Sequence, residues 1–458
     1  MIRETIREKY KRKEFSSKNA WILFTREPVP GMTKTRLMPY FSETQCAMLH
    51  KCFIRDIARE MTKADADIII AYTGGEPEYL KKVFRNNAIF ICQRGDDLGV
   101  RMENAIADTF ALGYERVILT GSDIPEIEAE SVETAFALLD AGDVVIGPTA
   151  DGGYYLIGMK KLHHEAFDVK LYGVATVFEE TVASMKSAGL TVLKADTYED
   201  IDTPEDIADY RDRMTEDAGL RYSYTGRYLA RTASISVIVP VYNEEDAVTG
   251  LMDQLGPYSD DLEIIFVDGG STDNTVSLIG DRFKVIRSSK GRGCQLNAGA
   301  MESSGDILFF LHCDSVLPKD FKSQIRRVMA SHPWGCFGVR FPSRNLFMKT
   351  NRIISNHRAL VRGLPFGDQG IFIGRRLFFE MGMFPEIPVM EDYAFSLRLR
   401  RYGYRPGMTR RRIETSDRRY GDSTASILRT ELDMWNLRRL YRKGLSADEL
   451  SRRYEDIR

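Results

Sequence analysis

The sequence has 458 residues, too many for one ordinary hydrophobic core, so we expect two domains. Hydrophobic residues make up 43% and charged residues 28%, as in soluble globular proteins, and no apolar run approaches the roughly 20 residues of a membrane-spanning helix. The net charge of -2 is unevenly distributed along the chain: residues 1–18 carry +4, residues 398–458 carry +8 and the residues between them carry -14. Basic ends on an acidic body suggest anionic ligands or an anionic surface.

Short apolar runs alternate with helical patterns in the first half of the chain. Strands are predicted at 21–24, 67–72, 89–92, 116–120 and 143–147, with helices between them, for example over 43–63 and 128–141. Such alternation predicts an α/β domain whose central sheet is mostly parallel and covered by helices on both faces.

The same alternation restarts in the second half, with strands predicted at 234–242, 263–268, 283–287 and 307–311. We therefore expect a basic leader over 1–18, one α/β domain over 19–214, a polar linker over 215–233 and a second α/β domain over 234–458. A solvated helix face explains the charge of the leader as well as a binding role does.

The six cysteines include no CxxC pair, and three lie in apolar or strand-like surroundings, as reduced core cysteines do. A reducing cytoplasm fits this pattern best. The first 18 residues lack the hydrophobic segment of a secretory signal.

A phosphate site is predicted after the first strand, in "TREPVPGMTKTRL". Gly31 lies in a turn, and Lys34 and Arg36 follow at an expected helix start, a combination that suits phosphate groups but does not have Walker spacing. A second turn, in "QRGDDLGVRM", offers Gly95, with Arg101 on the helix beyond it.

Acidic residues follow other strands of the first half. Asp123 comes directly after a strand in "LTGSDIP", and "DIDTPEDI" adds Asp200 and Asp202 before a helix. Two separated carboxylates could hold one Mg²⁺ on a nucleoside triphosphate. The alternative for "DTPEDI" is a helix start with Pro in its first turn, which explains Thr203 and Pro204 but not Asp202.

These segments, together with "DGGYYLIG", resemble the radical-SAM/selenodomain-associated transferase 1 family over residues 19 to about 212. That family is similar to nucleotidyltransferases of the GT-A fold. The resemblance implies that Lys34 and Arg36 stabilise a departing pyrophosphate, that Asp123 and Asp202 hold the metal, and that Asp151, Gly152, Gly153 and Tyr154 line the acceptor pocket. Tyr172 stands where that family tends to carry tryptophan.

In the second half, ligands are again expected at the carboxyl ends of the strands. Pro240, Asn243 and Glu244 follow the first strand, and Asp268 follows the second, where it can accept hydrogen bonds from a base or ribose. Two glycines after Asp268 let the backbone pass close to a ligand. The Ser-Thr-Asp run over 271–273 could instead cap the next helix.

The fourth strand ends in His312, Cys313 and Asp314, each a metal-binding residue type. A zinc site needs three or four converging ligands, whereas adjacent residues on a strand point to opposite faces. We therefore expect Asp314 alone to bind Mg²⁺ or Mn²⁺, and Cys313 to fill space.

Seven ordered segments resemble a family 2 glycosyltransferase of the GT-A fold from residue 234 to about 455, and more closely the radical-SAM/selenodomain-associated transferase 2 group, which is linked to arsenosugar biosynthesis. They are "SVIVPVYNEE", "IIFVDGGSTDNT", "GRGCQLNAGA", "LHCDSVLP", "WGCFGVRF", "GDQGIFI" and "PVMEDYAFSLRLRR". The expected fold is thus two tandem GT-A domains.

The second resemblance implies roles for further residues. Pro240, Asn243, Glu244 and Asp268 would hold the nucleotide, Arg292 would approach the diphosphate, and Asp314 would stand for the last carboxylate of the DxD signature. Asp392 would be the acid–base residue of an inverting transfer. Asp368, Gln369, Glu391 and Arg419 would contact substrate. The alternative for Glu391 and Asp392 is an acidic pair favoured by a helix dipole.

The leading hypothesis is a bifunctional enzyme that activates a sugar as a nucleotide derivative and then transfers the sugar to a small-molecule or lipid-linked acceptor hydroxyl. Alternatives are two glycosyltransferases, or a peripheral membrane scaffold with decayed sites at the inner membrane face. Leu428, Leu432 and Trp435 are spaced as on a helix with basic residues nearby, which suits a membrane surface. Packing of that apolar stripe on the domain is the favoured explanation.

Overall fold

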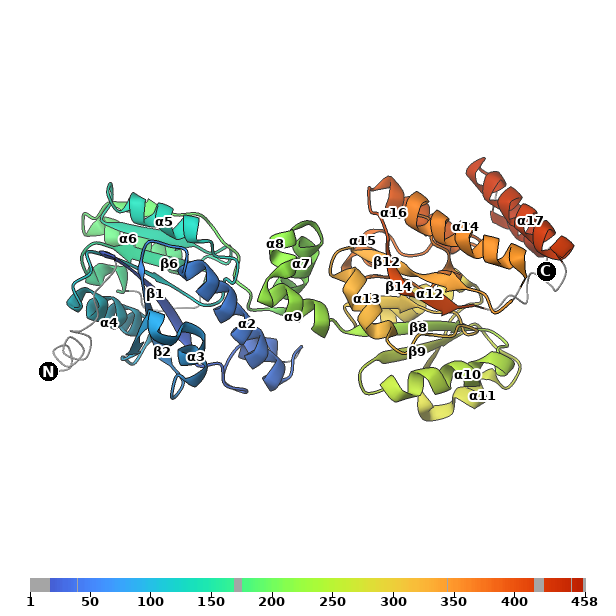
Figure 1. The fold of residues 1–458 in the computed structure, drawn as a ribbon, viewed down its shortest axis with the longest axis horizontal. Coiled ribbons are helices and arrows are strands. Elements are labelled where there is room, and N and C mark those ends of the chain that lie inside the picture. The colour runs from blue at the N-terminus through green and yellow to red at the C-terminus, as the bar shows by residue number, and fades with distance from the viewer. Residues whose placement is uncertain are drawn as a thin grey trace. The chain divides into compact units, whose positions relative to one another are not determined.

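The structure is a computed structural model that describes residues 17–38, 40–168, 175–343, 345–415, 424–445 and 447–455. The chain forms two compact units, the first from Met1–Tyr210 and Tyr222–Leu229 and the second from Arg211–Arg221 and Ala230–Arg458. Figure 1 shows the ribbon of each. The predicted site residue Arg419, together with Tyr172 and residues 1–16 of the basic leader, lies outside the described residues.

The first unit is built on a seven-stranded sheet of order β3-β2-β1-β4-β6-β5-β7. Only β6 runs antiparallel to its neighbours β4 and β5. The strands are β1 Asn19–Arg26, β2 Asp67–Thr73, β3 Ala88–Cys92, β4 Arg116–Thr120, β5 Val144–Pro148, β6 Tyr154–Met159 and β7 Val192–Lys194. The mostly parallel sheet predicted from the sequence is confirmed.

Helices cover both faces of this sheet. They are α2 Glu43–Met61, α3 Glu78–Phe84, α4 Leu98–Ala111, α5 Ala129–Leu138 and α6 Val177–Ser187, and α7 Pro204–Glu216 follows them in the chain. Alternation along β1 sends Trp21 and Leu23 into the cluster with α2, α3 and α5, and Ala20 and Ile22 into the cluster with α4. This two-sided burial explains why the strands read as continuous apolar runs.

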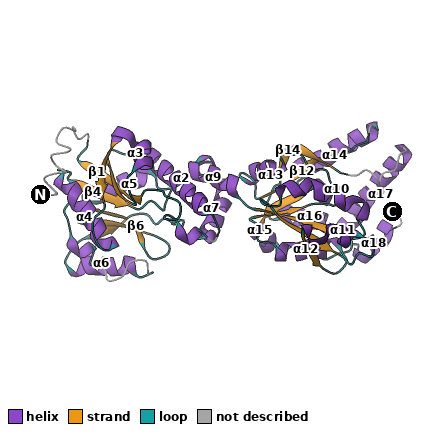
Figure 2. Ribbon diagram, turned by 90° about the horizontal axis from the view of Figure 1, so that it is seen from below, coloured by secondary structure: helices purple, strands orange, loops and turns teal. Residues whose placement is uncertain are grey.

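The second unit repeats the order as β10-β9-β8-β11-β13-β12-β14, with β13 antiparallel to β11 and β12. Its strands are β8 Ile235–Val241, β9 Glu263–Asp268, β10 Lys284–Arg287, β11 Ile307–Phe310, β12 Trp334–Arg340, β13 Ile371–Gly374 and β14 Gly407–Glu414. Its helices are α10 Glu245–Leu255, α11 Thr275–Ile279, α12 Arg292–Glu302, α13 Phe321–Met329, α14 Leu346–Arg362, α15 Arg375–Glu380, α16 Glu391–Arg401, α17 Thr424–Arg442 and α18 Ala447–Glu455. Figure 2 shows helices on either side of its strands.

The segment 215–233, predicted to be a polar linker, is largely helical in the structure, with α8 Ala218–Tyr222 and α9 Tyr224–Thr232. Its anchor is distant in sequence, because both carboxylate oxygens of Asp56 accept backbone N–H groups, from Tyr224 and from Thr225, at 2.8 Å. A local pattern could not reveal that contact. Among the helices that the structure describes, none has the length and hydropathy to cross a bilayer.

Candidate active sites

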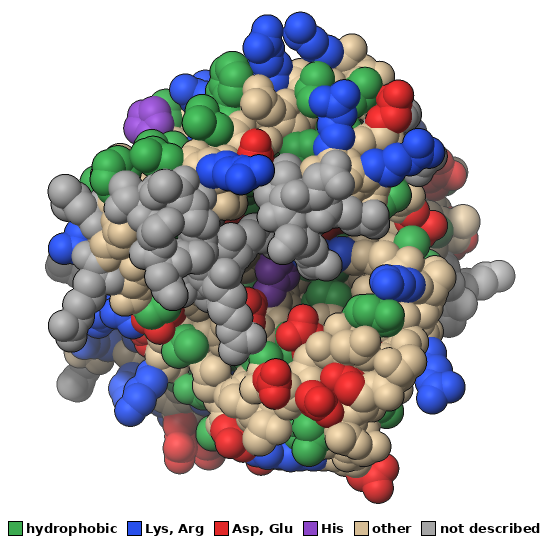
Figure 3. All heavy atoms as spheres, turned by 90° about the vertical axis from the view of Figure 1, so that its right-hand side faces the viewer, with side chains coloured by type: hydrophobic (Ala, Val, Ile, Leu, Met, Phe, Trp, Pro, Cys, Tyr) green, Lys and Arg blue, Asp and Glu red, His purple; other side chains and the backbone are tan. Residues whose placement is uncertain are grey.

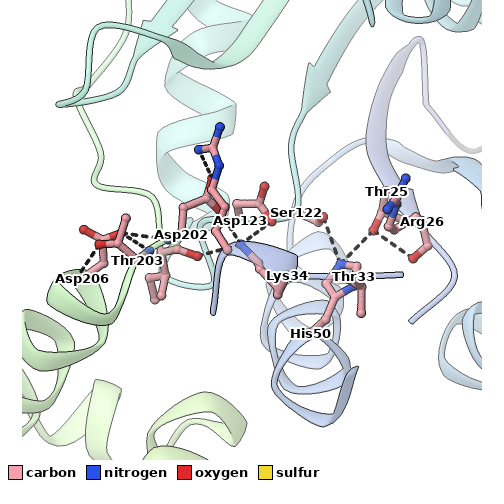
Figure 4. Close-up of polar contacts among 12 residues, drawn as sticks. Thr25, Arg26, Thr33, Lys34, His50, Ser122, Asp123, Asp202, Thr203 and Asp206 are labelled. Carbon is pink, nitrogen blue, oxygen red and sulfur yellow. Dashed lines mark hydrogen bonds and ion pairs between the residues drawn. The ribbon is translucent and has the colours of Figure 1, made fainter. Parts of the chain in front are cut away.

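A pocket of about 320 Å³ opens at the carboxyl ends of β1 and β4 in the first unit. Its lining includes Thr25, Lys34, Arg36, Arg101, Asp123 and Asp202. The structure therefore brings together five residues that the sequence predicted separately, from segments up to 168 positions apart. Figure 4 shows the polar contacts at the centre of this group.

Lys34 is the hub of the pocket. Its Nζ lies 2.7 Å from Asp123 Oδ1 and 2.8 Å from Asp202 Oδ1, and donates a 2.6 Å hydrogen bond to the carbonyl of Ile201. The side chain is only 5% exposed. Burial works to lower the pKa of Lys34, but the two carboxylates outweigh it and the pKa is raised, so the ammonium stays charged.

The backbone at Lys34 is unusual, with a φ of 50° in the left-handed region. A non-glycine residue in that region is costly, and such strain is found where a side chain must be aimed at a functional point. The short 3-10 helix Thr35–Leu37 follows, and Arg36 on it lies 3.3 Å from Asp202 Oδ2.

The two carboxylates of the pocket are held in different ways. Asp123 follows β4, and the Lys34 ammonium holds its pKa below the ordinary value although partial burial works to raise it. Asp202 precedes α7, whose start is fixed by Asp206 Oδ2, which accepts the N–H groups of Asp202 and Thr203 at 2.8 and 2.7 Å. The helix-start interpretation of "DTPEDI" is therefore right, and Asp202 also lines the pocket.

The pocket's oxygen donors are suited to Mg²⁺ or Mn²⁺. Asp123 and Asp202 each place an oxygen within 2.8 Å of one nitrogen, so their carboxylates converge on a single point. Hard oxygen ligands are what these ions prefer. Within the described residues, no group of three or more His, Cys, Asp or Glu side chains is close enough to hold a metal.

A third acidic group lies in the field of the first two. Burial, then the charges of Asp151 and Asp202, raises the pKa of Asp200 to about 6. A carboxyl with that pKa is partly protonated near neutral pH, and a nearby cation would favour its charged form.

His50 was not predicted from the sequence. It is 2% exposed on α2, with Nδ1 2.7 Å from Thr33 Oγ1 and Nε2 3.3 Å from Thr25 Oγ1 and 3.2 Å from Ser122 Oγ. It therefore links the residue before Lys34 to the residue before Asp123 (Figure 4). A lone histidine in an apolar helix pattern gave no signal of this role.

The other predicted residues of the first unit frame the pocket. Arg101 lines it and donates from Nε to the carbonyl of Gly95 at 2.9 Å. Gly31 and Gly95 have φ angles of 80° and 138° and shape the loops without lining the pocket.

The predicted acceptor turn is held by its own hydrogen bonds. Asp151 Oδ1 accepts from Thr149 Oγ1 at 2.5 Å and from the N–H of Gly153 at 3.0 Å. Gly152 has a φ of 90°, and a Cβ there would lie 2.0 Å from the carbonyl oxygen of Ala175. Tyr154 begins β6 and is partly buried. These residues stand beside the pocket and do not line it.

In the second unit, Asp268 and Asn243 hold one loop. Asp268 is 2% exposed and its Oδ1 accepts the N–H of Ser271 at 2.9 Å. Asn243, with a φ of 53°, accepts the N–H of Thr272 at 2.8 Å. Asp273 precedes Asn274, the N-cap residue of α11, and its Oδ1 accepts the N–H of Thr275, the first residue of the helix, at 3.0 Å.

The neighbouring predicted nucleotide ligands, Pro240 and Glu244, lie at the end of β8 and directly before α10, at the same sheet edge. Glu244 also donates its N–H to Thr275 Oγ1 at 2.7 Å. The carboxyl ends of β8 and β9 therefore meet as predicted.

A second cluster surrounds Asp392 at the start of α16. Its Oδ2 accepts the N–H of Gly367 and its Oδ1 the N–H of Tyr393, both at 2.6 Å. A Cβ on Gly367 would lie 2.7 Å from His312 Nε2 and 3.3 Å from Asp392 Oδ2, so these three residues adjoin. His312, set aside in the sequence analysis, is therefore beside the predicted acid–base residue.

Glu391 points to a different partner, with Oε1 3.3 Å from Arg292 Nη1. Burial raises the pKa of Glu391 although Arg292 opposes this shift. Glu391 thus orients the arginine predicted to meet the diphosphate. The pair does begin a helix, as the dipole interpretation requires, but Glu391 and Asp392 engage separate groups.

One predicted residue is placed differently from expectation. Gln369 is fully buried, and its amide bonds to the backbone of Phe366 and Phe337, so it supports the loop from inside and does not reach a substrate. Asp314 is exposed at the end of β11, whereas Cys313 is 4% exposed and burial raises the pKa of its thiol, as expected of a space-filling residue. Asp368 lies half-buried beside Gln369.

Comparison with known proteins matches both halves of the chain. Residues 57–173 match the family described as "Uncharacterized protein conserved in bacteria (DUF2064)", and residues 236–402 match "Glycosyl transferase family 2". An uncharacterized glycosyltransferase of Haemophilus influenzae is 26% identical over 177 residues, which are 36% of this chain and 70% of that protein. A 2-phospho-L-lactate guanylyltransferase of Methanosphaera stadtmanae is 24% identical over 185 residues, 39% of this chain and 77% of that protein.

A solved structure from Desulfovibrio desulfuricans G20, a provisionally named nucleotide-diphospho-sugar transferase, is 37% identical to this chain. The match covers 46% of this chain and 94% of that one, with a TM-score of 0.44.

Proposed function

We propose that this chain, whose residues 236–402 match "Glycosyl transferase family 2", carries two successive transfer activities. The first unit is a nucleotidyltransferase that joins a nucleoside triphosphate to a phosphorylated sugar or similar molecule and releases pyrophosphate. The second is an inverting glycosyltransferase that moves a sugar from a nucleotide-sugar to an acceptor hydroxyl. The observation that carries the first half is the Lys34 ammonium, held between two carboxylates inside a pocket.

The chemistry of the first unit follows from charge. A triphosphate entering the pocket meets Lys34, Arg36 and Arg101, which can bind its oxygens and stabilise the charge that develops on pyrophosphate. Transfer of the Lys34 ammonium to the phosphates would leave Asp123 and Asp202 free to hold Mg²⁺ or Mn²⁺, which would neutralise further phosphate charge.

In the second unit, Asp392 is the proposed general base. Two backbone N–H groups fix its carboxylate, and Arg292 stands nearby on Glu391, where it can meet the diphosphate leaving group. Asp392 would accept the proton of the acceptor hydroxyl as that oxygen attacks the sugar carbon opposite the leaving group. Asp314, exposed at the strand end, is the proposed metal ligand there.

The narrower family placement, among the radical-SAM/selenodomain-associated transferases of arsenosugar biosynthesis, is likewise a proposal that rests on the segments quoted from the sequence. The cytoplasm is the proposed compartment, which the free thiols of all six cysteines support.

The test uses the full chain, two site variants and one control variant. Pyrophosphate release from UTP, GTP or CTP is measured with a panel of sugar 1-phosphates and Mn²⁺, and nucleoside diphosphate release is measured with nucleotide-sugars. Lys34→Met should abolish pyrophosphate release and leave diphosphate release intact, and Asp392→Asn should do the reverse. Lys81→Met, an exposed lysine paired with Glu76, is the control and should change neither. Release of nucleoside diphosphate through the Lys34 pocket would support the alternative that both units are glycosyltransferases.

A further inference from the structure

Helix α14 is oriented with its apolar side outward. Its inward face, packed on β12 and β14, carries Met348, Asn351, Ser355 and Ala359, and Ser355 Oγ donates to Asn351 Oδ1 at 3.2 Å. Its outward face carries five large apolar side chains that are 41% to 62% exposed, namely Phe347, Ile353, Ile354, Leu360 and Val361. A surface helix of a globular protein normally shows the reverse arrangement, and contiguous exposed apolar surface marks an interaction site.

Helix α17 contacts α14 and exposes a second apolar stripe. Leu428, Leu432 and Trp435 are 45%, 62% and 48% exposed. Packing of this stripe on the domain, favoured in the sequence analysis, is wrong for these residues, because α17 packs through its other face, with Leu437 buried and Tyr441 against Tyr393.

The charge around these stripes favours an anionic partner. Helix α14 has four Lys or Arg residues and no Asp or Glu, and α17 has four Arg residues against two acidic ones. In Figure 3, hydrophobic side chains lie among Lys and Arg in the upper part of this face, and Asp and Glu gather below. Two copies meeting through the same face would bring like charges together, whereas an anionic bilayer accepts both the apolar and the basic groups.

We propose that the outward faces of α14 and α17 dock on an anionic membrane surface. The site of the second unit lies on the inner side of these helices, since the rings of Tyr393 and Tyr441 on the packed face of α17 are 5.8 Å apart and α14 ends five residues before Gly367, the donor to Asp392. Docking would hold the unit that contains Asp392 at the same bilayer surface as an acceptor hydroxyl carried by a lipid. That consequence rests on the proposed function, whereas docking itself does not.

Vesicle flotation of the full chain tests the docking. The chain should float with phosphatidylcholine vesicles that contain phosphatidylglycerol, much less with phosphatidylcholine alone, and less at high salt. Ile353→Ser with Ile354→Ser should weaken binding roughly tenfold or more, because two apolar side chains no longer enter the bilayer. Leu278→Ser with Met301→Ser is the control, since both are exposed apolar residues of the same unit outside these helices.

Trp435 supplies an independent readout. The other two tryptophans, Trp21 and Trp334, are fully buried, so quenching of fluorescence by brominated lipid should report Trp435 alone. Absence of flotation, equal binding by the Ile353/Ile354 variant, or lack of quenching would overturn the proposal. So would a dimer in sedimentation equilibrium that the same double substitution dissociates, because a second copy would then be the occupant. If the chain transferred the sugar but did not bind vesicles, the docking proposal would be refuted and the proposed function would stand.

Discussion

His50 connects three segments that meet only in the folded chain: the end of β1, the loop that carries Lys34, and the loop that carries Asp123. Its neutral ring has one donor and one acceptor nitrogen, and hydroxyl groups can serve either. Burial disfavours the imidazolium and lowers the pKa of His50 to about 4, although Asp123 opposes the shift. The ring is therefore a neutral brace for the pocket at physiological pH.

The lowered pKa of His50 predicts that the stability of the folded chain depends on pH. Between the ordinary pKa of 6.5 and about 4, the unfolded chain binds a proton at His50 that the folded chain does not, so stability falls as the pH falls through this window. The loss at its lower end should be about 3 kcal/mol. Urea unfolding across that range should show a steeper loss for the wild type than for His50→Gln. Parallel pH profiles of the two proteins would contradict the prediction.

At the residue scale, strand-end reasoning identified Lys34, Asp123 and Asp202, because ligands gather where parallel strands end. It paired the two carboxylates as ligands of one metal ion and assigned Lys34 to the phosphates, but did not show that the ammonium bridges the two carboxylates. That contact spans 168 residues and depends on a left-handed backbone at Lys34, which no local pattern specifies. His50 escaped notice for the same reason, since its partners lie 17 to 72 residues away.

At the element scale, the turn between β5 and β6 depends on a glycine. Gly152→Ala should destabilise the chain by clearly more than Gly113→Ala, its matched control. Both positions have a left-handed φ, 90° and 109°, which costs roughly 1 kcal/mol for alanine, but only the first places a Cβ against backbone, 2.0 Å from the Ala175 oxygen. Thermal unfolding of both variants measures the difference. Equal midpoints would show that the segments around Gly152 and Ala175 separate easily.

Two of the strands that the sequence did not predict share a cause. Strands β6 and β13 are short apolar runs, "YYLIGM" and "IFIG", that follow glycine-containing turns and insert antiparallel between strands formed elsewhere in the chain. The sequence did not predict these two strands, because each directly follows turn residues and pairs with strands that lie elsewhere in the sequence. Most of the parallel strands that were predicted, such as β1, β8, β9 and β11, are buried on both faces, which makes each a continuous apolar run.

At the scale of the whole molecule, the two sheets have the same strand order, and a glutamine plays the same part in each. Gln93 donates from Nε2 to the carbonyls of Thr25 and Ala71, at the ends of β1 and β2. Gln295 donates likewise to Val241 and Val267, at the ends of β8 and β9. In each unit, therefore, a glutamine amide links two adjacent parallel strands near their carboxyl ends. Asp123 and Asp314 follow the corresponding strands β4 and β11.

Two units with separate sites should respond separately to ligands. Replacing Trp334 and Trp435 by Phe leaves Trp21, fully buried on β1, as the only fluorescent reporter of the first unit. A triphosphate with Mn²⁺ at about 100 times its Kd should stabilise that unit by about 2.7 kcal/mol and raise the urea midpoint of the Trp21 signal. Lys34→Met in the same background should abolish the shift, because the phosphates lose the cation in the pocket. If UTP, GTP and CTP all left the urea midpoint unchanged, a triphosphate site in this pocket would be refuted. If a nucleotide-sugar shifted the midpoint equally, the pocket would be assigned to glycosyl transfer.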